Sequence, residues 1–225
     1  MSKKLLIFPV ALVLMVVLAA CGGTTTTPTV AQTTSQNSSA ATSAGPDADG
    51  DGIPDSAETL LGTDPNNADT DGDGILDLDD NEPTSLDNPI NENSTTVGFT
   101  IDNILVENNQ NADGSDAPDH LELTVTNTTT VDITNFDVYY TITDTTTSVV
   151  QSYYRTLPGF TLAAGETGTI HFDNSGEAGH FSVNPNSAYY TDTNELVFEV
   201  TLHAEGFAPQ TINVTKDAGG AEAPD

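Results

Sequence analysis

Hydrophobic and polar residues alternate in short runs along the chain from about residue 97 onward. In residues 120–127 the side chains of Leu121, Leu123 and Val125 fall on one face of an extended strand, and residues 195–203 repeat this pattern. Runs of this kind, rich in Val, Ile, Thr, Tyr and Phe and separated by turn residues, cover residues 97–101, 120–127, 136–144, 148–154, 167–173, 195–203 and 210–216. Because no helical period lies between them, we predict an antiparallel β-sandwich over residues 95–217.

The N-terminal segment has a different pattern. Lys3 and Lys4 precede an apolar run from Leu5 to Leu18, which ends in small residues before Cys21. This run is shorter than the roughly 20 residues that span a bilayer, but it suits the core of a secretory signal. We therefore predict a signal peptide over residues 1–20, with an uncleaved N-terminal anchor helix as the alternative.

The end of this segment, Leu18-Ala19-Ala20-Cys21, resembles the signal motif of bacterial lipoproteins, and Cys21 is the only cysteine of the chain. The resemblance implies cleavage before Cys21 and lipidation of its sulfur, with acyl chains such as palmitate. More than one acyl chain is needed for stable attachment, which a lipoprotein has. The expected location is outside the cytoplasm, anchored to the bacterial cell membrane or the outer membrane. An intramolecular disulfide is excluded because a second cysteine is absent.

Composition and charge distinguish the remaining segments. Residues 21–45 are uncharged and rich in Thr and Ser, which predicts a disordered tether, and residues 218–225 are expected to be a disordered tail. The formal net charge is -30. A surface of this charge repels phosphate backbones and anionic lipid headgroups, so nucleic acid is excluded as a partner and cations are expected.

Residues 46–92 form an acidic module that contains an internal repeat. Fifteen Asp and Glu residues and no Lys or Arg occur there, and a shift of 22 residues superposes two copies of the pattern D-x-D-x-D-G-I-x-D. Each copy is a twelve-residue loop with carboxylates at places one, three, five, nine and twelve and glycine at place six. Ca²⁺ takes six to eight oxygen ligands, and such a loop supplies them from alternate side chains, one backbone carbonyl and a final carboxylate. An acidic disordered spacer is the alternative, but a spacer needs no fixed register.

The segment 47–82, including the connector 61–66, resembles the thrombospondin type 3 repeats of bacterial proteins, whose loops are EF-hand-like. The resemblance implies two calcium ions. The first would be held by Asp47, Asp49, Asp51, Asp55 and Glu58 with the carbonyl of Ile53, and the second by Asp69, Asp71, Asp73, Asp77 and Asp80 with the carbonyl of Ile75. Asp64 is a further candidate for either ion, and Asp79 or Glu82 is an alternative to Asp80. A short helix over residues 56–61, closed by Gly62, is expected to leave the first loop.

The predicted sandwich resembles the immunoglobulin-like modules of bacterial surface proteins. The resemblance is carried by residues 121–127, by the turn 162–167 and by residues 206–209. It implies the fold and a surface location, but no specific ligand.

Candidate residues for other chemistry are few. His171 and His203 lie in predicted strands and are interpreted as structural, and no nucleophile elbow surrounds Ser175 near His180. We therefore expect no enzyme. Three tyrosine pairs are expected to point one ring inward and one outward from strands: Tyr139-Tyr140, Tyr153-Tyr154 and Tyr189-Tyr190. A weaker candidate for a further calcium site is the loop 108–120, which contains Asp113, Asp116 and Asp119.

The sequence thus predicts a lipid-anchored surface protein in which Ca²⁺ rigidifies the acidic module and presents the sandwich for adhesion or recognition. One alternative is a module that binds polysaccharide or an envelope protein through exposed tyrosines. The least favoured alternative is a secreted hydrolase, which would need a pocket that brings His171 or His180 together with carboxylates.

Overall fold

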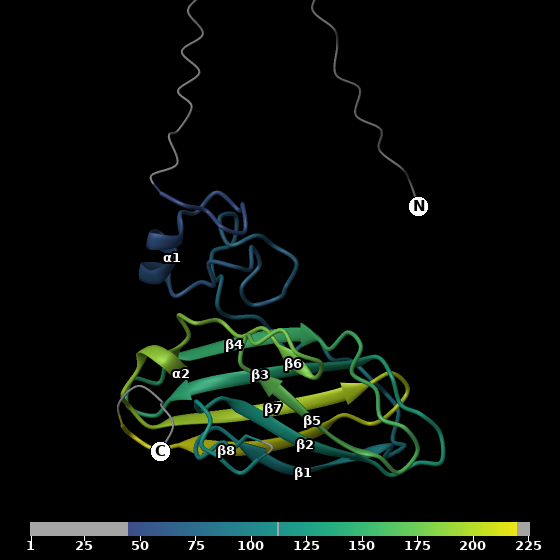
Figure 1. Ribbon diagram of the computed structural model, residues 1–225. Coiled ribbons are helices and arrows are strands. Elements are labelled where there is room, and N and C mark those ends of the chain that lie inside the picture. Colours follow the sequence, from purple (N-terminus) through teal and green to yellow (C-terminus); the bar gives the residue numbers. More distant parts are fainter. Residues whose placement is uncertain (1–44, 112, 220–225) are drawn as a thin grey trace, which may run out of the picture. The chain divides into compact units, whose positions relative to one another are not determined.

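The computed structural model describes residues 45–111 and 113–219 and is mainly β (Figure 1). The predicted signal peptide, the predicted lipidation site Cys21 and nearly all of the predicted tether lie outside these residues, as does most of the predicted tail. Within the described ranges, no helix has both the length and the apolar character needed to cross a membrane.

Two four-stranded sheets make up the β-rich part. The first has the strand order β1-β2-β5-β6 and the second β4-β3-β7-β8 (Figure 1). The bounds are β1 Phe99–Leu105, β2 Leu121–Asn127, β3 Phe136–Asp144, β4 Val150–Thr156, β5 Thr167–Phe172, β6 His180–Phe181, β7 Leu196–Ala204 and β8 Gln210–Lys216. Neighbouring strands are antiparallel except for the parallel pair β5 and β6. A register shift in β1 between Ile101 and Asn103 marks a β-bulge.

The core lies between the sheets, as the alternation of apolar residues predicts. In β2 and β3 every second residue is buried. Rings from the two sheets meet there: Phe99 of β1 contacts Phe136 of β3 with centroids 5.5 Å apart, and Phe172 of β5 lies 5.8 Å from Tyr140 of β3. Such ring contacts between the two inner faces are the arrangement of a β-sandwich.

All seven predicted runs form strands, but two elements were not predicted. Strand β6 has only two residues, too few to show an alternating pattern. Helix α2, Ala188–Thr191, contradicts the expectation that no helix interrupts the strands. Its Tyr189-Tyr190 sequence has strand propensity, and the local turn overrides that preference because Tyr190 N and Thr191 N both bond to the carbonyl of Ser187.

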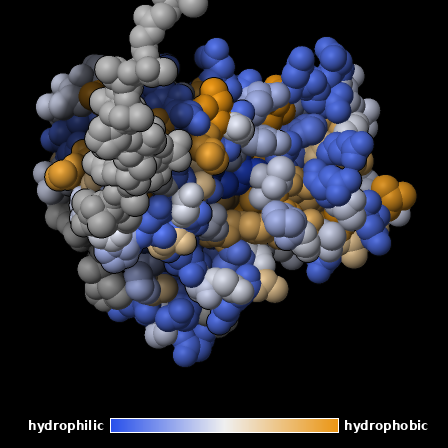
Figure 2. Space-filling model, turned by 90° about the horizontal axis from the view of Figure 1, so that it is seen from above, coloured by the Kyte–Doolittle hydropathy of each residue, from blue (hydrophilic) through white to orange (hydrophobic). Residues whose placement is uncertain are grey.

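The acidic module has little hydrophobic core of its own. Its one helix, α1 (Asp55–Leu61), ends at Gly62 with φ of 83°, which confirms the predicted exit helix and its glycine cap. Among the described residues of this module, Ile53 is the only buried hydrophobic side chain, whereas Leu60 is 88% exposed. Seen from above in Figure 2, hydrophobic residues occur as small separate areas on a largely hydrophilic surface. Apolar burial therefore contributes little to holding this module together.

Candidate metal centre

The two acidic loops have the same backbone geometry, 22 residues apart. Gly50 N donates to Asp47 Oδ1 at 2.8 Å, and Gly72 N donates to Asp69 Oδ1 at 2.9 Å. The glycines at places four and six all have positive φ, from 80° at Gly50 to 102° at Gly52. A β-carbon is disfavoured in this region, so the glycines permit the turn of the chain in both loops.

The carboxylate at place nine closes each loop. Asp55 N donates to the carbonyl of Pro46, and the Asp55 carboxylate accepts from Ala48 N at 2.9 Å. The second loop repeats both bonds: Asp77 N donates to the carbonyl of Ala68, and Asp77 Oδ1 accepts from Thr70 N at 2.8 Å. Thr70 Oγ1 adds a bond of 2.7 Å to Asp77 Oδ2. Asp55 and Asp77 thus close the loops through these hydrogen bonds.

Each loop gathers its first three carboxylates into one cluster. Carboxylate oxygens of Asp47, Asp49 and Asp51 lie within 4.8 Å of one another, and those of Asp69, Asp71 and Asp73 do the same. Like charges at such distances repel, because their interaction in a partly dry environment amounts to several kcal/mol. Each cluster is therefore arranged so that a cation would lower its energy.

Three buried carboxylate oxygens of the first loop lack a partner. Asp49 Oδ2, Asp51 Oδ2 and Glu58 Oε2 are inaccessible to solvent and accept no hydrogen bond from any described residue. The Glu58 side chain comes from α1 and is fully buried. Burying an unpaired carboxylate is costly, so such groups in proteins are paired or coordinate a metal.

Burial and like charge raise the pKa values of these carboxyl groups. Desolvation is the largest cause for Glu58, and the carboxylates of Asp49 and Asp51 add to it, which together raise its pKa to about 7. In the second loop, burial followed by the charges of Asp73 and Asp80 raises the pKa of Asp71 to about 6. Glu58 and Asp80, at place twelve of their loops, therefore lie close enough to act on the other carboxylates of their own loops.

The other candidate ligands differ in position. Asp64 is buried, and burial raises its pKa; its backbone N donates to Thr70 Oγ1 of the second loop at 2.7 Å. Ile53 N and Ile75 N donate to Asp51 and Asp73. Asp79 and Glu82 are exposed.

The acidic module docks on the edge strand β4. Tyr154 N donates to the carbonyl of Asp71 at 2.7 Å, and Ser152 N donates to the carbonyl of Thr84 at 2.9 Å. Ser152 Oγ also bonds to the backbone of Leu86 in both directions. An edge strand presents unpaired backbone groups, and these bonds pair them. The second acidic loop thus covers part of the sandwich edge.

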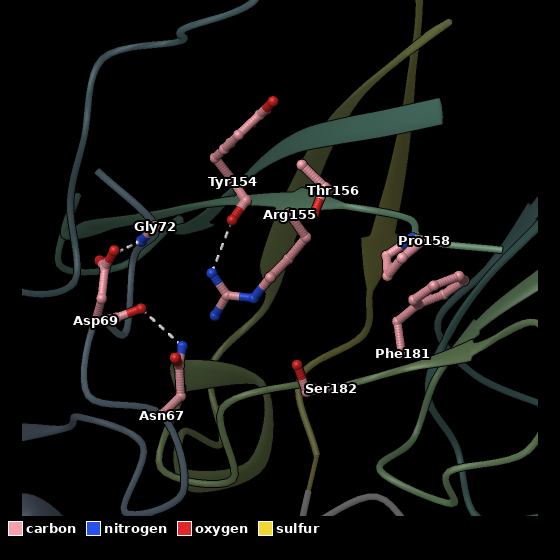
Figure 3. A pocket seen from close by; sticks show the side chains of 9 residues that line it. All are labelled: Asn67, Asp69, Gly72, Tyr154, Arg155, Thr156, Pro158, Phe181 and Ser182. Carbon is pink, nitrogen blue, oxygen red and sulfur yellow. Dashed lines mark hydrogen bonds between the residues drawn. The ribbon is translucent and has the colours of Figure 1, made fainter. Parts of the chain in front are cut away.

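Arg155 reinforces this contact. Its guanidinium donates to the carbonyl of Thr70 in the second loop and to the carbonyl of Tyr154 on its own strand. In Figure 3 the Arg155 side chain extends toward the loop that carries Asp69 and Gly72. A β-carbon on Gly72 would lie 2.3 Å from the carbonyl oxygen of Tyr154, so glycine is required for this approach. Sequence reasoning did not single out Arg155 or Gly72 as contact residues.

The structure brings three histidines together that are far apart in the sequence. His120, His171 and His180 line one pocket with Asp173 and Glu177. His203 lies elsewhere, where its Nδ1 is 2.8 Å from Asp137. The pocket that the hydrolase alternative requires therefore exists.

No family model matches the chain, and no curated protein matches it either. The resemblance of the loops to thrombospondin type 3 repeats remains a prediction. Function has to be inferred from the geometry of these residues.

The tyrosine pairs meet the expectation in two cases of three. Tyr140 and Tyr153 are buried, while Tyr139 and Tyr154 face outward as direct cross-strand partners. The third pair does not lie on a strand. Residues 188–191 are helical, and the rings of Tyr189 and Tyr190 contact each other, so the two-face rule of a strand does not apply.

The loop 108–120 does not gather its carboxylates. Asp119 is buried and accepts from Asn109 N at 2.9 Å, whereas Asp113 is exposed and accepts from Ser115. Asp113, Asp116 and Asp119 form none of the metal-ligand clusters found among the described residues. Their hydrogen bonds instead shape the connection between β1 and β2.

Proposed function

We propose that this chain is a calcium-binding, lipid-anchored protein of the bacterial cell surface, in which two Ca²⁺ ions hold the acidic module against a β-sandwich. The observation that carries the proposal is the set of buried, unpartnered oxygens of Asp49, Asp51 and Glu58. A cation in the Asp47, Asp49 and Asp51 cluster would offset the charge of these buried carboxylates. The second loop repeats the backbone geometry of the first, which supports a second ion there.

Calcium is the ion that suits these ligands best. The candidate ligands are all oxygens, and all but Asp55 and Glu58 of α1 lie on loops, which fits the flexible coordination of Ca²⁺. Mg²⁺ demands stricter octahedral geometry and gives up water reluctantly. Zinc sites in proteins are built mainly from Cys and His, which neither loop contains.

The proposed role of calcium is mechanical and involves no turnover. Without an ion, repulsion between the carboxylates opposes a module that has almost no core. With it, the carbonyl of Asp71 stays in place to accept from Tyr154, and the orientation of the module on β4 is fixed. The sandwich is then presented in one defined way for adhesion or recognition.

The strand order supports an immunoglobulin-like sandwich of the surface-module kind. The order β8-β7-β3-β4 corresponds to the G-F-C-C′ sheet of variable-type immunoglobulin domains, with β1, β2 and β5 in the opposite sheet. Attachment at Cys21 through lipid completes the proposal. Membrane fractionation tests it: the wild type is expected in the membrane fraction and Cys21→Ser in the soluble exported fraction.

Calorimetric titration of the whole chain with CaCl2 tests the calcium sites. We expect two bound ions and an increase in ordered structure by circular dichroism that EDTA reverses. Glu58→Gln should remove one ion. Glu195→Gln is the charge-matched control, because Glu195 is exposed on the sandwich and only its backbone carbonyl is bonded. An identical calcium stoichiometry in Glu58→Gln and wild type would overturn the first site.

A second candidate function is binding of a polysaccharide or an envelope protein through tyrosines. The direct pairing of Tyr139 and Tyr154 on the outer face of the second sheet favours it, because adjacent rings provide a stacking surface. Tyr139 Oη donates to the carbonyl of Leu86, so this surface borders the acidic module. Retention of envelope binding by the double variant Tyr139→Leu/Tyr154→Leu would contradict this function.

A further inference from the structure

A group of histidines and a carboxylate lies on the outer face of the first sheet, away from the calcium loops. Glu122 of β2 and His171 of β5 are direct cross-strand partners, and His171 pairs in turn with His180 of β6. His120 directly precedes β2 and is buried. Asn109 contacts His120, whose backbone N donates to the Asn109 side chain.

The ligand atoms of three of these residues face one another. His120 Nε2 lies 2.9 Å from His171 Nδ1, and His171 Nδ1 lies 3.4 Å from Glu122 Oε2. All three ligand atoms fall within 4.8 Å. Two nitrogens that bind one Zn²⁺ ion tetrahedrally at about 2.0–2.1 Å are about 3.3 Å apart. The two nitrogens therefore need to separate by a few tenths of an ångström, and the rings need to turn so that both lone pairs point at the ion.

Hydrogen bonds to the opposite ring nitrogens prepare two of the histidines. His120 Nδ1 lies 2.8 Å from the carbonyl of Pro118, which only accepts, so Nδ1 carries the proton and Nε2 keeps its lone pair. His180 Nδ1 lies 2.7 Å from Asp173 Oδ2 in the same way. Metal-binding histidines are held by such bonds to a carbonyl or carboxylate.

We propose that His120 Nε2, His171 Nδ1 and Glu122 Oε2 bind one divalent transition-metal ion, with Zn²⁺ as the ion that fits best. Two imidazoles and one carboxylate are a known zinc ligand set that leaves a fourth position open. To bind, neutral His171 carries its proton on Nε2 in place of Nδ1. The site does not compete with the calcium loops, because Ca²⁺ prefers oxygen ligands and imidazole suits Zn²⁺, Cu²⁺ or Ni²⁺.

The fourth coordination position of the proposed ion would face the adjacent pocket. This pocket has a volume of about 530 Å³ and is lined by His120 and His171 together with Asp173, Ser175 and His180. The His180 ring stacks nearly parallel on His171 with ring centroids 4.3 Å apart, so it lies at the edge of the site. Water or a donor atom of a small ligand in this pocket completes the coordination.

Calorimetric titration of the whole chain with ZnCl2, in the presence of saturating CaCl2, tests the proposal. One zinc ion per chain is expected in the wild type. His171→Gln and Glu122→Gln should each weaken zinc binding at least about tenfold. His203→Gln is the matched control, because His203 lies next to Asp137 and Glu92 outside this pocket, and it should bind zinc as the wild type does.

Two further measurements separate loss of the site from loss of the fold. Each variant should keep two calcium sites and the wild-type circular dichroism spectrum. In the wild type itself, zinc should shift the ring-nitrogen NMR signals of His120 and His171 and leave those of His203 in place. The proposal is overturned if the calcium-saturated wild type takes up no zinc, if both variants bind it as tightly as the wild type, or if the His120 and His171 signals stay unchanged.

Discussion

The backbone amide of Tyr154 donates a hydrogen bond of 2.7 Å to the carbonyl oxygen of Asp71. Tyr154 belongs to the edge strand of the sandwich, and Asp71 is the third residue of the second acidic loop. One peptide unit thus joins the candidate metal centre to the sheet. Order in the loop and order at the edge of the sheet are therefore linked.

This link predicts a local response to calcium removal. In EDTA the amides of Ser152 and Tyr154 should exchange with solvent faster, because their acceptors belong to a module that opens. Amides between the central strands β3 and β7 should keep their protection. Hydrogen-exchange NMR with and without calcium checks both, and equal exchange of Tyr154 in the two conditions would contradict the link.

A glycine pair tests the docking independently of metal ligands. Gly72→Ala and Gly50→Ala both place a β-carbon at positive φ, which costs roughly 1–2 kcal/mol. Only Gly72→Ala also drives the β-carbon to 2.3 Å from Tyr154 O, whereas Gly50 has nothing within 4 Å. Thermal unfolding with calcium present should show a clearly larger destabilisation for Gly72→Ala. Equal losses would mean that the loop does not dock on β4.

The effect of Glu58→Gln on the melting temperature should change sign when calcium is added. Without calcium at pH 8, the substitution removes one of several buried like charges near Asp49 and Asp51, so the melting temperature should rise. With millimolar calcium, the lost ligand should lower the melting temperature below that of the wild type. Differential scanning calorimetry measures both conditions, and a shift of the same sign in both would argue against a ligand role.

Asp144, which lies outside the metal centre, should make the stability of the fold depend on pH. Its carboxylate ends β3 and accepts hydrogen bonds from Thr147 Oγ1, Asn194 Nδ2 and two backbone amides, which lower its pKa well below the ordinary value. A lowered folded-state pKa contributes stability above the unfolded pKa of about 3.9 and loses it as the pH falls. Asp144→Asn should therefore be less stable than wild type at pH 7.

The gap between Asp144→Asn and the wild type should close as the pH falls below about 4, because the unfolded wild-type chain then takes up the proton. Denaturant unfolding at pH 7, 5 and 3 measures this gap. The exposed Glu195→Gln variant serves as the control and should follow the wild type throughout. A gap that stays constant down to pH 3 would show that the charge of Asp144 is not the cause.

Much of the fold could be predicted because its signals are local. The alternation of Leu121, Leu123 and Val125 marks β2, and Gly62 marks the end of α1, since both depend on neighbours in the sequence. Helix α2 was missed because Tyr189 and Tyr190 favour strands, while the bonds to Ser187 that form the turn cannot be read from propensity.

The candidate sites follow the same rule: a site of neighbouring residues could be predicted, and a site of distant residues could not. The acidic loops are contiguous, so the register of Asp47, Asp49 and Asp51 is visible in the sequence. His120 and His171 are 51 residues apart and meet only through the register of β2 on β5, which the sequence does not encode in a readable way. Docking on β4 was missed because it uses backbone groups, which every residue possesses.

Covering β4 has a consequence for how copies of the molecule behave toward one another. Strand edges with free amide groups are where separate sandwiches join into larger aggregates. Under the proposed mechanism, removing calcium would expose the backbone amides of Ser152 and Tyr154. The edge of β4 would then be free to pair with a strand of another copy. Extracellular calcium would then keep the protein soluble as well as fix the orientation of the acidic module.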